Sequence, residues 1–330
     1  MDSVKALPKK AGWRPFPSRR KSAAENTGLM LKKDFKRNRM LYLMIIPVLL
    51  FYIVFSYIPM SGIIIAFKDY KPALGIWGSP WTSDFGLKHF IDFFQTPVFG
   101  RLIKNTLTLS LGTLIAGFPA PIILALLLSE VRFRRLKKTV QTITYFPHFI
   151  SLVVVCGIIK EFCLSDGLFN VVGSWFGLQP TAMLQQPGLF PPIYIISHVW
   201  QKIGWDSIIY IAAIAGVDTQ LYEAAELDGC GRFKKLWYIT LPCIKPTIVI
   251  LFIMAVGNIM SVGSEKILLL YNESIYQTAD VVSTYMYRKG LLEFNFSYST
   301  AVNLFNSVIN FSLVFLANHF SRKITNESLF

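Results

Sequence analysis

Apolar residues in this chain gather into six long runs, with polar segments between them. The runs cover residues 41–67, 105–128, 139–159, 196–217, 246–263 and 298–320. About 20 consecutive apolar residues cross a bilayer as an α-helix. The pattern therefore predicts an all-α integral membrane protein with six transmembrane helices. Pro119 and Pro121 lie inside the second run and predict a kink there.

Composition supports a membrane protein over a soluble one. Hydrophobic residues make up 53% of the 330 residues, and the mean hydropathy is +0.47. A soluble domain of this size needs more polar surface than such a composition supplies. The net charge of +14 could indicate a nucleic-acid-binding surface. The basic residues, however, lie at the chain ends and in short loops, so they are interpreted as topology signals, and no nucleic-acid partner is expected.

The distribution of Lys and Arg predicts the orientation in the membrane. One set of segments carries 23 of these residues and the opposite set carries 8; the sets are 1–40, 131–138, 218–245 and 321–330 against 68–104, 161–195 and 264–297. Because cytoplasmic loops are enriched in Lys and Arg, both termini are expected in the cytoplasm of a multi-pass protein. We divide the chain into a basic cytoplasmic tail, 1–38, and a six-helix membrane domain, 39–330, whose cytoplasmic loop is 218–245.

Sequence patterns for catalysis or metal binding are missing. The four Cys and four His residues form no cluster with metal-ligand spacing. The chain also contains no G-x-x-x-x-G-K-[ST] pattern for binding ATP phosphates. We therefore expect no enzyme activity, no metal site and no cofactor bound by this chain.

The loop at 218–245 has strong helix signals for a connector between two apolar runs. Asp218 or Thr219 is suited to begin a short helix, and Gly229 is suited to end it. A second, amphipathic helix is predicted to follow. Pro242 is expected to end that helix, and Pro246 to begin the next membrane span. From these patterns alone, the loop is either a solvated connector or a docking segment.

The stretch "EAAELDGCGRFKKLWYITLPCIKP" resembles the EAA motif of permease subunits in ATP-binding-cassette importers. The positions that match the motif are Glu223, Ala224, Ala225, Gly229, Ile239, Leu241 and Pro242, whereas Cys230 replaces the usual small Ala. The resemblance implies that residues 222–229 form a coupling helix that inserts into a cleft of an ATPase subunit. The residues it implies for coupling are Tyr222, Glu223, Ala224, Ala225, Asp228, Gly229, Leu241 and Pro242.

Other segments extend the resemblance over most of the chain, among them "YFPHFISLVVVCGII" and "WQKIGWDSIIYIAAIAGVD". They are similar to the carbohydrate branch of these permeases, the LplB-like polysaccharide permeases, which are related to the MalF-like maltose permease. The resemblance implies the type I importer fold in a bacterial cell membrane and half of a pathway for an oligosaccharide. It also implies as partners a second permease, an extracellular solute-binding protein and two ATPase subunits that hold the ATP and Mg.

Polar residues within the fourth run are candidates for the substrate pathway, since polar groups inside a membrane are costly. They are Trp200, Gln201, Lys202, Trp205 and Asp206. Lys202 and Asp206 are four residues apart, so an ion pair with a structural role is one interpretation. The other is a pocket in which these polar groups bind sugar hydroxyls and a Trp stacks on a sugar ring.

Four Asn residues in the last two runs are the remaining pathway candidates. Asn258 is in the fifth run, and Asn303, Asn306 and Asn310 share one face of the sixth. Hydrogen bonding between helices and contact with substrate both remain open for them. Two alternatives to an oligosaccharide importer are a secondary transporter working alone and an importer permease for a non-sugar solute.

Overall fold

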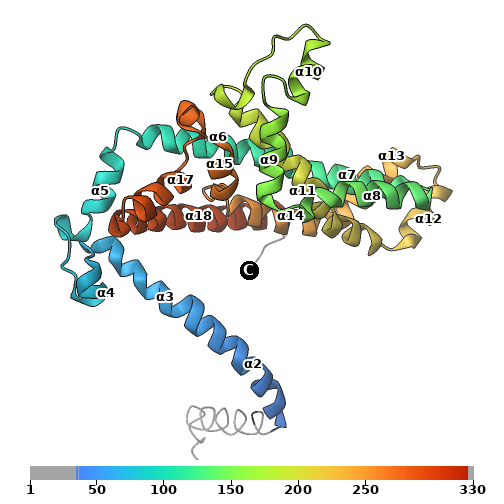
Figure 1. The fold of residues 1–330 in the computed structure, drawn as a ribbon. Helices are drawn as coiled ribbons and strands as arrows, with labels where there is room; N and C mark the ends of the chain where they lie inside the picture. Colours follow the sequence, from blue (N-terminus) through green and yellow to red (C-terminus); the bar gives the residue numbers. More distant parts are fainter. Residues whose placement is uncertain (1–34, 36, 326–330) are drawn as a thin grey trace, which may run out of the picture. The chain divides into compact units, whose positions relative to one another are not determined.

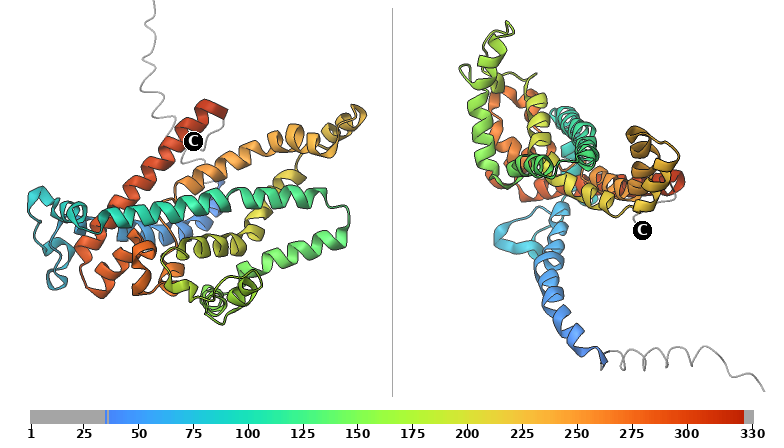
Figure 2. Two further views of the ribbon diagram at one scale, coloured as in Figure 1. Left: turned by 90° about the horizontal axis from the view of Figure 1, so that it is seen from above. Right: turned by 90° about the vertical axis from the view of Figure 1, so that its right-hand side faces the viewer.

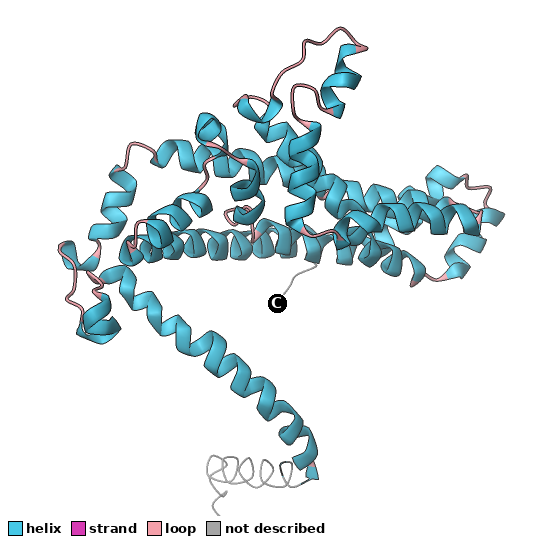
Figure 3. Cartoon of the chain, in the orientation of Figure 1, coloured by secondary structure: helices cyan, strands magenta, loops and turns pink. Residues whose placement is uncertain are grey.

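The computed structural model describes Phe35 and residues 37–325 of the chain. The described residues are helical apart from loops and an isolated antiparallel bridge between Lys68 and Trp81 (Figure 3). The all-α prediction is therefore confirmed for this part of the chain. The predicted tail, 1–38, lies outside the described residues except for Phe35, Arg37 and Asn38.

The helices follow one another without long gaps in the described chain (Figure 1). In chain order they are α2 (Arg39–Tyr52), η1 (Ile53–Tyr57), α3 (Ile58–Met60), η2 (Ser61–Phe67), η3 (Pro72–Leu74), α4 (Gly75–Gly78), η4 (Asp84–Gly86), α5 (Lys88–Gln95), α6 (Phe99–Gly117), α7 (Pro119–Glu130), α8 (Arg134–Phe149), α9 (Leu152–Phe162), α10 (Leu168–Ser174), η5 (Met183–Gln185), α11 (Phe190–Ala215), α12 (Thr219–Leu227), α13 (Arg232–Lys235), η6 (Leu236–Thr240), α14 (Leu241–Val256), α15 (Ser264–Leu270), η7 (Glu273–Ile275), α16 (Tyr276–Ala279), α17 (Val282–Tyr287), η8 (Arg288–Leu292) and α18 (Phe296–Thr325).

The described part of the chain divides into two units, the first ending at Gly62 and the second beginning at Ile63. In the first unit, the described helices α2, η1 and α3 contain no buried residue. The apolar window of the helical stretch Arg39–Phe67 likewise buries none of its residues against this chain. So large an exposed apolar surface is unfavourable in water. We therefore expect lipid or another protein to cover it.

The second unit is built around the 26-residue helix α11. Helix α11 packs against α6, α7 and α8, and α18 packs against α5, α14 and α17 (Figure 2). Close approach of α11 to α8 depends on Gly204, because a Cβ at this position would collide with the backbone carbonyl of Thr144. The pathway candidates on α11 are therefore held by a helix that contacts most of the long helices of the unit.

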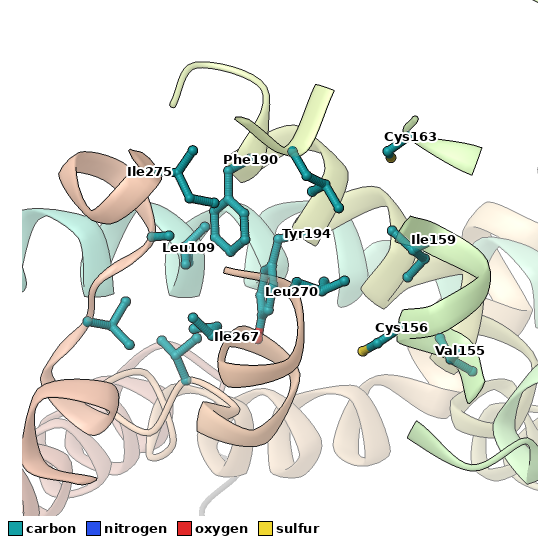
Figure 4. Close-up of a cluster of buried hydrophobic side chains, with 14 residues drawn as sticks. Leu109, Val155, Cys156, Ile159, Cys163, Phe190, Tyr194, Ile267, Leu270 and Ile275 are labelled. Carbon is teal, nitrogen blue, oxygen red and sulfur yellow. The ribbon is translucent and has the colours of Figure 1, made fainter. Parts of the chain in front are cut away.

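Two apolar clusters hold the second unit together. One joins α9, the start of α11 and α15, with Ile159, Tyr194 and Ile267 among its buried members (Figure 4). The other gathers aromatic rings around Phe93 on α5, which is 1% exposed and packs against Tyr285 and Tyr298. These clusters fix the short helices between α14 and α18 onto the long helices.

Four described helical stretches are long and apolar enough to cross a membrane. They are Arg39–Phe67, Phe99–Glu130, Arg232–Val256 and Phe296–Lys323, and a fifth is obtained if the bent pair α8 and α9 counts as one span. Helix α11 is not among them. The structure thus supports a multi-helix membrane protein, and six spans stay a prediction.

The third apolar run, 139–159, which the sequence analysis expected to form one membrane span, is divided between two helices that meet at a sharp bend. Helices α8 and α9 meet at 100°. Ile150 and Ser151 between them have extended backbone angles, and the Ser151 side chain accepts a hydrogen bond from the Val154 N–H to begin α9. Pro147 lies in the last turn of α8 and weakens its hydrogen bonding there.

The prediction that Pro242 ends a separate helix is wrong. The helix continues from Arg232 to Val256 through the π-helical turn η6, and Pro242 lies in the first turn of α14. A π-turn shifts the hydrogen-bond register, so the missing Pro242 N–H does not interrupt the helix. The next apolar span thus begins before Pro246, which lies inside α14.

Candidate functional site

Helix α12 is a short, well-terminated helix at the predicted coupling position. Its first turn is capped by Asp218, whose Oδ1 accepts a hydrogen bond from the Gln220 N–H at 2.9 Å. The helix ends before Gly229, which has φ +71°, and the Cys230 N–H donates to the Ala225 carbonyl at 2.8 Å. This left-handed glycine C-cap agrees with the sequence prediction for Gly229.

One face of α12 is turned toward the chain itself. Tyr222 and Ala225, three residues apart, share this face: the Tyr222 hydroxyl lies 2.8 Å from Thr240 Oγ1, and Ala225 is 8% exposed. The sequence analysis placed both Ala224 and Ala225 where a partner could approach. Only Ala224 is exposed, because Ala225 lies on the inward face of the helix.

The opposite face of α12 is open. Glu223, Ala224, Asp228 and Gly229 are exposed there, and Leu227 is 91% exposed. Sequence reasoning did not single out Leu227, although an apolar residue next to the Asp228–Gly229 helix end is visible in the motif. On the same helix, Glu226 accepts a hydrogen bond from Lys235 Nζ at 2.5 Å, and this bond lowers the pKa of Glu226.

Leu241 and Pro242 follow Thr240 directly in the chain. Leu241 is half-buried and Pro242 is exposed, both at the start of α14. They therefore belong to the continuous helix that receives the Tyr222 hydrogen bond, rather than to α12.

Two adjoining cavities lie among the helices of the second unit. The first, of about 350 Å³, is lined mainly by α6, α7, α11 and α14, and the second, of about 690 Å³, mainly by α11, α15 and α18. Both are lined by the same five residues, Tyr194, His198, Ser261, Val262 and Gly263.

The cavities bring together most of the pathway residues predicted from the sequence. Asp206 and Asn258 line the first cavity. The second cavity is lined by Gln201, Lys202, Asn303 and Asn306. The structure thus gathers, around one hollow region, polar groups from α11, α18 and the segment after α14.

The ion pair considered for Lys202 and Asp206 does not form. No salt bridge within 4.0 Å involves either residue in the described part of the chain. The two side chains instead line different cavities.

Three predicted pathway residues do not line either cavity. Trp200 and Trp205 are 44% and 41% exposed, and the Trp205 ring is stacked on His148 at 4.4 Å between ring centroids. Asn310 bonds within the chain: its Oδ1 accepts from the Met260 N–H at 3.0 Å, and its Nδ2 donates to Ser261 Oγ at 2.8 Å. The geometry favours a structural role for Asn310.

Lys266 on α15 is the main cavity residue that sequence reasoning missed. It is 4% exposed, lines the second cavity, and its Nζ has no hydrogen-bond partner among the described residues. The sequence placed it in a loop outside the membrane spans, where a Lys is unremarkable. His198 was also missed, although its i, i+4 spacing to Lys202 put both on one face of the fourth run.

Comparison with known proteins gives a consistent relationship over most of the chain. Residues 117–326, more than half of the sequence, match the family "Binding-protein-dependent transport system inner membrane component". The Bacillus subtilis (strain 168) "Polygalacturonan/rhamnogalacturonan transport system permease protein YteP" is 45% identical over 89% of this chain and 91% of that protein. "Protein LplB" of the same organism is 42% identical over 92% of this chain and 95% of that protein.

Solved structures show the same relationship. The chain is similar, with a TM-score of 0.82 and 46% identity, to a chain of "a bacterial ABC transporter involved in the import of the acidic polysaccharide alginate". The match covers 90% of this chain and 99% of that one. A second structure, matching at 45% identity and the same TM-score, has that importer "in complex with alginate pentasaccharide-bound periplasmic protein".

Proposed function

The chain belongs to the family of binding-protein-dependent transport system inner membrane components, and we propose that it forms half of the membrane pathway of an importer for an oligosaccharide. The family is one of permease subunits, whose ATPase is a separate chain, so this chain is a transport component and not an enzyme. As expected from the resemblance, it is a permease of the carbohydrate branch.

The pair of polar cavities carries this proposal. Amide, hydroxyl and charged side chains from several helices line both cavities, a composition suited to a hydroxylated solute. The two apolar clusters hold the lining helices in place. The relatives transport polysaccharide-derived substrates according to their names, so an oligosaccharide released from a polysaccharide is the solute that fits both observations.

The exposed face of α12 is the proposed contact with an ATPase subunit. Glu223, Ala224 and Asp228 are available to a partner, and Gly229 allows the sharp chain reversal after the helix. Tyr222 and Ala225 hold the helix on this chain, and Leu241 and Pro242 receive its movement. ATP and Mg are bound by the partner subunits in this scheme.

The rest of the assembly follows from the same family relationship. A second permease completes the pathway, and a solute-binding protein delivers substrate from outside, as the alginate importer structure illustrates for its own periplasmic protein. Six membrane spans with both termini in the cytoplasm of a bacterial cell complete the proposal. This proposed orientation puts α12 on the same side of the membrane as the ATPases, and the distribution of Lys and Arg supports the orientation.

The coupling proposal is tested with the double variant Glu223→Lys and Gly229→Trp. Both changes alter the exposed end of α12, so the chain should insert and pair with its second permease but fail to co-purify with the ATPases. Glu273→Lys, which reverses an exposed carboxylate far from α12 in the sequence, is the matched control and should co-purify normally. Full assembly and ATP-driven uptake by the double variant would contradict the assignment.

Uptake by proteoliposomes tests the transport proposal itself. Vesicles that contain both permeases, the ATPases and the binding protein should take up oligosaccharide only with ATP inside. Uptake by this chain without ATPases would indicate a secondary transporter instead, and uptake limited to non-sugar solutes would reject the substrate class.

A further inference from the structure

The unpartnered ammonium group of Lys266 points to a specificity residue. We infer that Lys266 binds a carboxylate of the transported sugar, so that this permease itself selects oligosaccharides that carry uronate residues. The inference rests on the proposed function, because it concerns the same cavity, and it assigns a role in recognition to a residue on α15.

Lys266 is buried without an opposite charge to balance it. It is 4% exposed, and no salt bridge within 4.0 Å reaches its Nζ within residues 37–325. The centroid of the Tyr194 ring lies 5.4 Å from Nζ, a cation–π contact. Burying a charged amine without a partner is costly, so such a group is kept only where it pairs with something or is needed for function.

The other charges around the second cavity do not provide that partner. Lys202, on α11, adds a second basic group to the lining. Glu265 is the acidic residue in this lining; it is exposed and bonds to neither lysine within the described chain. The buried charge in the cavity is therefore positive, which suits an anionic ligand.

Asn306 supplies a second unmet group in the same cavity. It is 5% exposed, lies on α18, and its Oδ1 accepts no hydrogen bond from the described residues. An unpaired acceptor and an unpaired ammonium group on residues that line the same cavity are complementary to a ligand that has both hydroxyl donors and a carboxylate. Uronate sugars have both groups on one ring. The cavity volume of about 690 Å³ is within the roughly 300–1,000 Å³ typical of small-molecule sites.

The test uses the complete importer, reconstituted in proteoliposomes with its binding protein. Uptake of an oligogalacturonate is compared with uptake of its methyl ester, which has the same chain length, one added methyl group per uronate and no carboxylate charge. The variants are Lys266→Gln, Lys266→Arg and Asn306→Ala, and the matched control is Lys289→Gln. Lys289 also carries a positive charge in the segment after α14, but it is paired with Glu293 and lines neither cavity.

We expect Lys266→Gln to raise the half-saturating concentration of the acid about tenfold or more, to spare the ester, and to leave assembly unchanged. Lys266→Arg should retain most uptake, and Lys289→Gln all of it. Asn306→Ala should weaken uptake of acid and ester by the same few-fold factor. If the wild type takes up the acid but not the ester, the ester cannot serve as the comparison. The test is then whether Lys266→Arg keeps the acid uptake that Lys266→Gln loses.

Three results with the variants would overturn the role of Lys266. They are normal acid uptake by Lys266→Gln, an equal loss of acid and ester, and loss in Lys266→Arg as large as in Lys266→Gln, which would indicate packing. A wild type that takes up only the ester would also reject it, while leaving oligosaccharide import intact. A wild-type importer that takes up no oligosaccharide of either kind would instead reject the proposed function.

Discussion

The hydroxyl oxygens of Tyr222 and Thr240 lie 2.8 Å apart and join α12 to the π-turn η6. Thr240 is 1% exposed, so the Thr240 end of this hydrogen bond is shielded from water, whereas Tyr222 is half-buried. It connects the helix that faces the proposed ATPase with a helix that continues to Val256. Movement of α12 therefore has a direct route into a membrane span.

Tyr222→Phe should weaken this connection while keeping the ring in place. A single hydrogen bond contributes about 0.5–1.5 kcal/mol, so folding should survive. ATP hydrolysis should continue, but fewer sugar molecules should be imported per ATP. The measurement is the ratio of uptake to phosphate release in proteoliposomes. Tyr238→Phe, at a Tyr that is 74% exposed, is the control, and an unchanged ratio for Tyr222→Phe would show that the bond carries no coupling.

Gly204→Ala should separate α11 from α8. The added methyl group would overlap the Thr144 carbonyl, a backbone group that cannot rotate away. Overpacking of this kind costs about 1–3 kcal/mol, so the thermal unfolding midpoint of the purified chain should fall. Gly157→Ala on α9 has open space around its new methyl group and should be neutral or stabilising. Equal midpoints for the two variants would be inconsistent with the close contact.

Asp280→Asn should destabilise the segment between α14 and α18. The Asp280 side chain is 1% exposed; its Oδ2 lies 2.7 Å from Arg288 Nη2, and its Oδ1 accepts from Thr284 Oγ1 at 2.9 Å. Removing one partner of a buried ion pair costs about 3–5 kcal/mol because the other charge is left unpaired. Denaturation monitored by circular dichroism measures this loss. The double variant Asp280→Asn with Arg288→Met should recover part of it, and no recovery would argue against the ion pair as the cause.

Asn310→Ala should reduce stability without changing substrate affinity. The variant removes both hydrogen bonds to the Met260–Ser261 segment and leaves a backbone N–H without its partner, a cost of about 1–3 kcal/mol. The half-saturating sugar concentration should stay within twofold of the wild type. Asn306→Ala is the counterpart: it should alter uptake with a smaller change in unfolding. The opposite pattern would exchange the roles of the two residues.

The sequence was sufficient for the helical class and for the end of helix α12, because both depend on local patterns. Long apolar runs predict membrane helices. The end of α12 at Gly229 follows because glycine can adopt the left-handed region, and Gly229 has φ +71°. The stop at Gly229 needed no information from distant residues, and of the two caps that the sequence left open, Asp218 and Thr219, the structure has Asp218.

Features that depend on contacts with neighbouring elements could not be predicted from the sequence. Pro242 normally ends a helix, and only the π-turn before it permits continuation. The inward orientation of Ala225 depends on Tyr222 reaching Thr240. Lys266 appeared to be an ordinary loop lysine because its burial depends on the packing of α15 against other helices, which the sequence does not show. Asn303, Asn306 and Asn310 share a face in sequence, yet only the fold separates cavity contacts from a bond to Ser261.

The unbroken helix from Arg232 to Val256 also limits which insertions and deletions this protein could tolerate. Each residue of an α-helix turns the chain by about 100°. Deleting or inserting one residue between Thr240 and Val256 would therefore swing Asn258 away from its cavity relative to the end held by Tyr222. Substitutions along this stretch alter its surface and packing. An insertion or deletion instead changes the angle, about the helix axis, between the two ends of the helix. Related permeases that use both the contact at Thr240 and the cavity position at Asn258 should thus preserve the number of residues between these positions, even where the residues themselves differ.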